Sequence, residues 1–222
     1  MKRTLALLLS SLLLSGPALA QETVDLGTLR NDEIQVVQKL LYPKEDRTEL
    51  GFALGVLAFD PYMIAPKIQV SFGKHLSEEL EVEGQLGLGY GLGRSTYREL
   101  RESYFETPEA YRYLTSLTAG VNWSPIYAKM NFMGNRVVHH DLYVPVVGGL
   151  TVERLAWGPK HFAFAPTVGL GVGVRVFQGD KNLVRLEVRD DILIENRKQS
   201  GTVAIKQNVG IHVGFSRLGD KK

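Results

Sequence analysis

The tightest group of side chains with catalytic or metal-binding potential is His139-His140-Asp141. An imidazole beside a carboxylate can bind a metal ion or activate a nucleophile. Successive side chains of a strand point to opposite faces, so His139 and Asp141 would share one face and His140 the other. A metal site needs a third ligand, and the sequence identifies none. We therefore predict a structural role for this group at one rim of the fold, with no catalytic residue and no metal site.

Two glycine-rich runs, residues 87–93 and 169–173, have the composition of nucleotide-binding loops. A phosphate-binding loop is followed by a helix, whereas bulky and small residues keep alternating through both runs. The sequence also lacks the Gly-x-Ser-x-Gly motif of serine hydrolases and the His-Glu-x-x-His motif of zinc proteases. These observations predict no cofactor and no enzymatic activity.

Charged residues recur on one side of the predicted strands. Inside a narrow barrel they must be paired, because burying an unpaired ion carries a desolvation penalty of several kcal/mol. We therefore predict a salt-bridged network that fills the lumen and closes the pore; a path for protons or ions is the alternative. The predicted lumen charges are Glu81, Glu83, Arg175, Arg185, Glu187, Arg189, Asp191 and Lys206, accompanied by Glu49, Lys67 and His212.

The elements that position these charges are strands, because from Thr48 onward the hydrophobic pattern has a period of two. In residues 80–93 and 168–176, for example, aliphatic residues alternate with glycines and charges. The pattern predicts about eight strands of roughly 10–15 residues, longer than the ~5–6 residues usual in soluble sheets. A tilted strand crosses a bilayer in ~9–11 residues, so these strands are long enough to do so.

The two faces of the strands distinguish a membrane barrel from a soluble one. Glycine inside a strand carries an entropic cost, so its density on the charged face needs a steric reason. The lumen of an eight-stranded barrel provides one, because it has room for few large side chains. The sequence therefore predicts an all-β fold, an eight-stranded antiparallel transmembrane β-barrel with its aliphatic face toward lipid. A soluble periplasmic ligand-binding barrel is the alternative.

The N-terminal residues predict export. Residues 1–20 combine Lys2 and Arg3, an apolar core and the small-residue cleavage site Ala18-Leu19-Ala20, as in a cleaved signal peptide. Residues 21–47 form a predicted periplasmic segment with a short helix at residues 32–41, and residues 48–217 form the predicted outer-membrane barrel.

Composition excludes several functions. The chain has no cysteine, which excludes disulfides, thiolate metal sites and an acylated lipoprotein cysteine. Loss of Lys2 and Arg3 with the signal would leave 24 basic and 24 acidic residues, from 26 and 24 in the full chain. A neutral chain has no electrostatic attraction for a phosphate backbone, so nucleic-acid binding is not expected.

The connections should alternate in length. Short turns near residues 77–79 and 179–182 would face the periplasm with both termini, and longer ones, above all residues 94–113, would face outward. The connection at residues 124–136 is longer than such a turn. Aromatic residues are expected near the two membrane interfaces. They are Phe59, Tyr62, Tyr90, Tyr97, Trp157 and Phe162 at one rim, and Phe72, Trp123, Tyr127, Phe177 and Phe215 at the other.

From Val36 to its end the chain resembles the small outer-membrane β-barrel domain family of myxobacteria. The similar stretches are residues 36–41 and 47–50, Asn135-Arg136-Val137 with Asp141-Leu142-Tyr143, and residues 186–191. The resemblance implies an eight-stranded outer-membrane barrel without a known common activity. Several such barrels belong to the adventurous gliding-motility apparatus, and the size and layout of this chain are similar to theirs.

Three positions depart from a regular barrel. Asp190 shares parity with Ile192 and Ile194, which would aim a carboxylate at lipid unless a bulge or a rim position intervenes. Pro145 inside a strand requires a bulge or irregular pairing. The last strand is expected to end at Phe215, with seven residues following.

The sequence thus favours a non-enzymatic, plugged outer-membrane barrel that acts in a cell-surface complex. Outer-membrane lipid surrounds it, and protein partners are expected at loop 94–113 or segment 21–47. A lipid-modifying hydrolase with a Ser/His/acid set on one rim, and a narrow ion channel, are the alternatives.

Overall fold

A computed structural model of the chain describes residues 41–58, 60–132, 136–158 and 160–221. The predicted signal peptide and, except for Leu41, the predicted helix at residues 32–41 lie outside these residues. The described part of the predicted N-terminal segment, residues 41–47, consists of turns and irregular chain.

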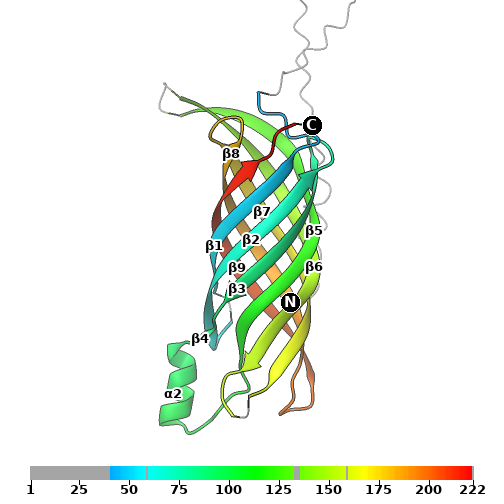
Figure 1. The fold of residues 1–222 in the computed structure, drawn as a ribbon. Coiled ribbons are helices and arrows are strands. Elements are labelled where there is room, and N and C mark those ends of the chain that lie inside the picture. The colour runs from blue at the N-terminus through cyan, green and yellow to red at the C-terminus, as the bar shows by residue number, and fades with distance from the viewer. Residues whose placement is uncertain (1–40, 59, 133–135, 159, 222) are drawn as a thin grey trace, which may run out of the picture. The chain divides into compact units, whose positions relative to one another are not determined.

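Eight long strands form a closed antiparallel ring (Figure 1). Each pairs with its neighbours along the chain, and β1 pairs with both β2 and β9, which closes the ring. The short β4 pairs with the first two residues of β2, and α2 follows β4. The all-β, eight-stranded prediction is therefore confirmed. The elements are β1 (Thr48–Leu57), β2 (Met63–His75), β3 (Leu80–Gly89), β4 (Leu92–Gly93), α2 (Ser95–Ser103), β5 (Tyr111–Phe132), β6 (Arg136–Leu155), β7 (Phe162–Phe177), β8 (Asn182–Asn196) and β9 (Val203–Leu218).

The ring carries its aliphatic residues on the outside. Leu86, Val172 and Ile211 are 45%, 63% and 55% exposed, whereas Arg189 is 1% exposed. Strand burial alternates accordingly, with polar and charged residues inside. The predicted orientation of the two faces is confirmed. None of the described helices is long and apolar enough to span a membrane.

Inward-facing glycines make room for large lumen side chains. A Cβ atom at Gly173 would overlap the ring of Tyr143, and one at Gly73 would overlap the carboxylate of Glu81. The density of glycine on this face therefore follows from the narrow lumen, as the sequence predicted.

The two ends of the barrel differ. At the termini end, where β1 begins and β9 ends, residues 76–79 and 178–181 connect the strands. At the opposite loop end, residues 58–62, 94–110, 156–161 and 197–202 do so, and α2 projects there (Figure 1). The expected alternation of short and long connections therefore holds for most of the ring.

The expectation for residues 124–136 was wrong. β5 continues to Phe132 and β6 starts at Arg136, so most of this stretch is a long hairpin instead of a loop. A bulge between Trp123 and Ile126 makes this possible by shifting the register. Pro125 lies in the bulge, where its missing N–H is tolerated.

Pro145, Asp190 and the end of the last strand are the other positions where the sequence departs from a regular barrel. Pro145 pairs with Asn122 on β5, but the β6–β7 ladder is interrupted there, so irregular pairing is confirmed. Asp190 does face outward, because β8 has no bulge at this position. It pairs with Leu170 of β7 on one side and with Val209 of β9 on the other. The last strand runs past Phe215 to Leu218, which pairs with Glu49.

The aromatic rims are only partly as expected. Phe72, Trp123 and Phe215 are exposed near the termini end, and Tyr90, Trp157 and Phe162 near the loop end. Tyr97 and Phe177 are instead buried, and Tyr127 packs against Phe177. Phe59 lies outside the described residues.

Candidate functional site

The lumen holds three groups of charged side chains, one above the other. The termini-end cluster consists of Lys44, Glu49, His75, Glu81, Glu83, Asp141, Arg175 and Arg185. The middle cluster consists of Lys67, Gln85, Glu187, Arg189, Asp191 and His212. The loop-end cluster consists of Asp60, Glu153, Glu195 and Lys206.

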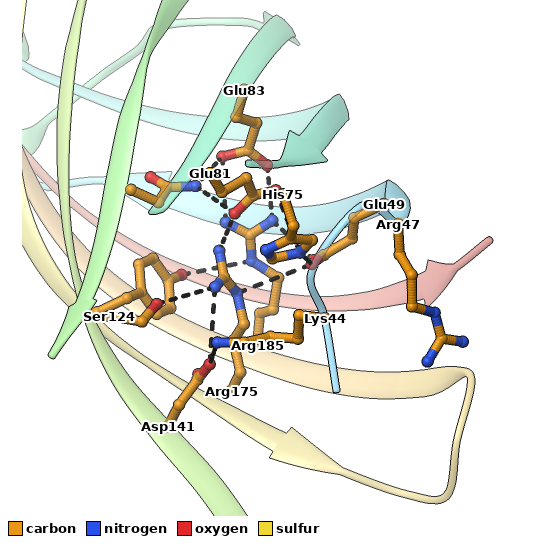
Figure 2. Close-up of polar contacts among 12 residues, drawn as sticks. Lys44, Arg47, Glu49, His75, Glu81, Glu83, Ser124, Asp141, Arg175 and Arg185 are labelled. Atoms are coloured by element: carbon orange, nitrogen blue, oxygen red, sulfur yellow. Dashed lines mark hydrogen bonds and ion pairs between the residues drawn. The ribbon is translucent and has the colours of Figure 1, made fainter. Parts of the chain in front are cut away.

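Two arginines organise the termini-end cluster (Figure 2). Arg175 contacts Glu81, lies 3.8 Å from Asp141 and 3.9 Å from Glu49, and donates to Ser124 Oγ at 3.2 Å. Arg185 donates to both oxygens of Glu83, at 2.6 and 3.2 Å, and to Glu49 at 3.2 Å.

The side chains of Asn122, His75 and Tyr143 add further contacts to this cluster. The Asn122 amide donates to Glu81 and Glu83 at 2.9 and 2.8 Å, and His75 bonds Glu49 at 2.9 Å. The Tyr143 ring lies 4.4 Å from the Arg175 guanidinium carbon. Bidentate and charge-assisted hydrogen bonds of this kind are the strong ones in proteins.

A strap formed by residues 42–47 closes the termini end. Lys44 of the strap is buried and pairs with Asp141 inside the barrel (Figure 2). The backbone N–H of Lys44 donates to Glu78 at 2.9 Å, and Arg47 donates to the Gly219 carbonyl at 2.7 Å. Tyr42 stacks on Phe177 with ring centroids 5.4 Å apart. The strap is therefore part of the barrel and no separate segment.

Lys44 matters for the charge balance. Without it, the termini-end cluster has four carboxylates for two arginines; with it, three cations face four carboxylates, beside His75. Because unpaired buried charges are costly, the strap contributes a counter-ion that the strands do not supply.

Lys44→Ala should lower the free energy of unfolding by about 2 kcal/mol, the value of a buried charge-assisted hydrogen bond. It should also speed proteolysis near residues 41–47. Both are measurable in detergent micelles, by urea titration and by limited digestion. Lys74→Ala is the control, because Lys74 is exposed on the outer face. Equal digestion rates for the two variants would contradict an anchoring role.

Glu49, His75 and Glu81 also place ligand atoms within 4.8 Å of one another, as in a metal site. However, Arg175 contacts both carboxylates. A metal ion there would be repelled by this guanidinium, whereas the ion pairs already satisfy the carboxylates. The geometry therefore fits an ion-pair network better than a metal centre.

The middle cluster is centred on Arg189. Its guanidinium contacts Glu187 at 3.1 Å, Asp191 at 2.8 Å and the Gln85 side-chain oxygen at 2.7 Å. Tyr143 donates to Glu187 at 2.8 Å. Lys67 and His212 are buried beside this group; neither ring nitrogen of His212 has a hydrogen-bond partner among the described residues.

The loop-end cluster places three carboxylates around one ammonium group. Lys206 Nζ lies 2.9 Å from Asp60, 2.9 Å from Glu153 and 3.2 Å from Glu195. A hollow of 440 Å³ at the loop end is lined by Asp60, Glu195 and Lys206, whereas two smaller hollows, lined by Lys206 and by Arg185, measure 10 and 20 Å³. Each smaller hollow holds about one water molecule, so side chains fill the lumen there.

All eleven charged residues expected in the lumen face the interior. Sequence reasoning missed Lys44, Asp60, His75, Glu153 and Glu195, and placed Asp141 at a rim. Extending the alternation farther along β2, β6 and β8 would have found the three strand residues, His75, Glu153 and Glu195. Lys44 carries no such signal, because the strap has no periodicity.

His139 and Asp141 have structural contacts in place of the Ser/His/acid arrangement of a hydrolase. Asp141 pairs with Lys44, and His139 packs edge-on against Tyr42 with ring centroids 5.2 Å apart. Among the described residues, no hydrogen bond joins a serine to a histidine. The arrangement stabilises the closed termini end.

No protein-family model matches the chain, and no curated protein matches it. Similar solved structures include the N-terminal β-barrel domain of Pseudomonas aeruginosa OprF, with 11% identity, 78% of this chain and 98% of that chain covered, and TM-score 0.41. Neisserial surface protein A (NspA) has 11% identity, 77% and 95% coverage, and TM-score 0.41. Ail, the attachment invasion locus protein of Yersinia pestis, has 12% identity, 79% and 99% coverage, and TM-score 0.41. Similarity this low transfers no function, so function must be inferred from the side chains.

Proposed function

We propose that this chain is a non-enzymatic outer-membrane β-barrel with a plugged lumen, acting as a structural or interaction component of a cell-surface complex. The observation that carries the proposal is the inverted distribution of polarity, with aliphatic residues around the outside and ion pairs inside. Water cannot stabilise such an outer surface, whereas hydrocarbon can. A soluble ligand-binding barrel would have the opposite arrangement.

The filled lumen supports a structural role over transport. Arg175, Arg185 and Arg189 extend into the interior, and each is held by carboxylates from other positions. Passage of an ion would require several buried ion pairs to separate. Each separation would cost several kcal/mol of free energy. Planar-bilayer recordings should therefore show no steady conductance.

Partner contact is proposed at the loop end. Tyr97 of α2 is buried against Met63 and Ala110, which anchors the helix. Tyr104 and Phe105 follow the helix and are 66% and 88% exposed. Phe105 has φ 56°, a left-handed conformation that non-glycine residues rarely adopt. Exposed aromatic residues on an anchored loop are typical of contact surfaces.

The neighbouring loop reinforces this region. Glu109 accepts hydrogen bonds from the backbone N–H groups of Gln199 and Ser200, at 2.9 and 3.0 Å, and from Tyr111 at 2.7 Å. Burial would raise the pKa of Glu109, but these hydrogen bonds hold it below its usual value. The carboxylate thus ties the two loops together near neutral pH.

A part in the adventurous gliding-motility apparatus is the finer form of this proposal. It is supported only by the resemblance of sequence stretches described above. The contact proposed for Tyr104 and Phe105 rests on their exposure and does not require the complex to be the gliding-motility apparatus.

Membrane insertion is tested by fractionation and by gel migration with and without boiling. The full chain should be extracted from membranes only with detergent, and the unboiled band should migrate differently from the boiled one. A freely soluble chain without a heat-dependent shift would overturn the proposal.

Partner contact is tested by photo-crosslinking from residue 105 in cells. We expect a crosslinked product of higher mass from position 105 and none from position 198, which is exposed on a different outer loop. Equal labelling from both positions would contradict a defined contact at the aromatic loop.

A further inference from the structure

Two arginines lie side by side on the outer face near the loop end. Arg112 of β5 and Arg154 of β6 are direct cross-strand partners. Both are half-buried, and both donate to the hydroxyl oxygen of Tyr90, at 3.0 and 3.3 Å. Like charges directly opposite each other on adjacent strands are destabilising unless a counter-charge is present.

The chain offers this pair no counter-charge. No carboxylate among the described residues lies within 4.0 Å of either guanidinium, in contrast to the lumen arginines. The Nε atom of Arg112 is buried without a hydrogen-bond acceptor. A planar guanidinium with free donors is the group best suited to a phosphate oxygen.

The surroundings add cations and an amphiphilic surface. Arg154 lines a hollow of 360 Å³ together with Leu155, Ala156, Trp157, Gly158 and Lys160. The Arg101 guanidinium carbon lies 3.7 Å from the centre of the Trp157 ring. The lining of this hollow contains two cations and no carboxylate.

The pair lies at the edge of the aliphatic surface. Phe162 pairs with Arg154 and is exposed, and the outward residues toward the middle of the barrel include Leu117 and Leu150. An amphiphile bound here would place its acyl chains against the aliphatic strands and its headgroup at the arginines.

We propose that Arg112 and Arg154, with Tyr90 and Lys160, form a binding site for the phosphate group of a membrane lipid. The inference rests on the membrane insertion proposed above and goes beyond it, because it assigns a specific lipid chemistry to one edge of the barrel. The phosphate supplies the counter-charge that the arginine pair lacks.

The full chain in neutral maltoside micelles is titrated with phosphatidylglycerol, and bound lipid is counted by native mass spectrometry. The double variant Arg112→Gln/Arg154→Gln should bind about tenfold more weakly than the natural chain, because two charge-assisted contacts are lost. Arg217→Gln is the matched control, because Arg217 is an outward-facing arginine at the termini end, and it should leave binding unchanged.

Two separate measurements distinguish a failure of the lipid site from a failure of the membrane barrel. The heat-dependent gel shift reports whether each variant forms the barrel, and lipid counting reports the site; if the double variant does not fold, Arg154→Gln alone replaces it. Equal binding by the arginine variants and the natural chain would overturn the site while leaving the barrel intact. Inorganic phosphate that competes at concentrations equal to the lipid would also overturn it, because the ligand would then be a free phosphate.

Discussion

Replacing Arg175 by methionine should lower the free energy of unfolding by about 3–5 kcal/mol. The Arg175 guanidinium is fully buried and faces Glu81, Asp141 and Glu49 at once. Methionine keeps most of the apolar stem but leaves these carboxylates without their main counter-ion. Urea unfolding in detergent micelles, followed by tryptophan fluorescence, measures the change.

Two further variants test the cause. Lys181→Met removes an ion pair with Asp220, in which both side chains are substantially exposed, and it should change stability little. Adding Glu81→Gln to Arg175→Met should recover part of the loss, because one stranded carboxylate is removed. A loss for Arg175→Met no larger than that for Lys181→Met would show that the lumen network does not stabilise the fold.

Val172→Arg should destabilise the barrel by about 2–4 kcal/mol in phospholipid vesicles. Val172 is 63% exposed on the outside of β7, between Leu170 and Val174 along the same face. Its strand neighbour across the ladder is Val188. A guanidinium at this position near the middle of β7 would have to reach water through hydrocarbon.

The control is Ile205→Arg, at an exposed position near the loop end of β9. Near an interface the same substitution should cost only about 0–1 kcal/mol, because the guanidinium reaches the headgroups. If both substitutions proved equally mild, as on a water-exposed surface, the aliphatic face would not contact lipid.

The alternation of side chains was readable in the sequence and determined most of the fold. Aliphatic residues at every second position of residues 80–88 and 168–176 require strands, because only a strand places them on one face. Glycines on the opposite face indicated a narrow lumen. The orientation of Leu86, Val172 and Arg189 follows from these two signals together.

Strand boundaries were less predictable where proline interrupts the pattern. Pro125 reads as the end of a strand, yet a bulge takes it up and β5 continues to Phe132. Tyr97 and Phe177 read as interface residues because their type is common there. Packing of α2 and of the strap buries them, and neither contact is encoded by local periodicity.

The sequence by itself determined which face of each strand lines the lumen, since parity along a strand is a local property. Only the tertiary structure decided which charges meet. Arg175 and Glu81 are 94 residues apart, and Arg185 and Glu83 are 102 apart, so their contact depends on the register and closure of the whole ring. Lys44 reaches Asp141 from outside the strands, across 97 residues. Lys44 supplies a counter-ion for the carboxylates that the two arginines leave in excess. That excess arises only when the barrel closes, so no single segment of the sequence shows it.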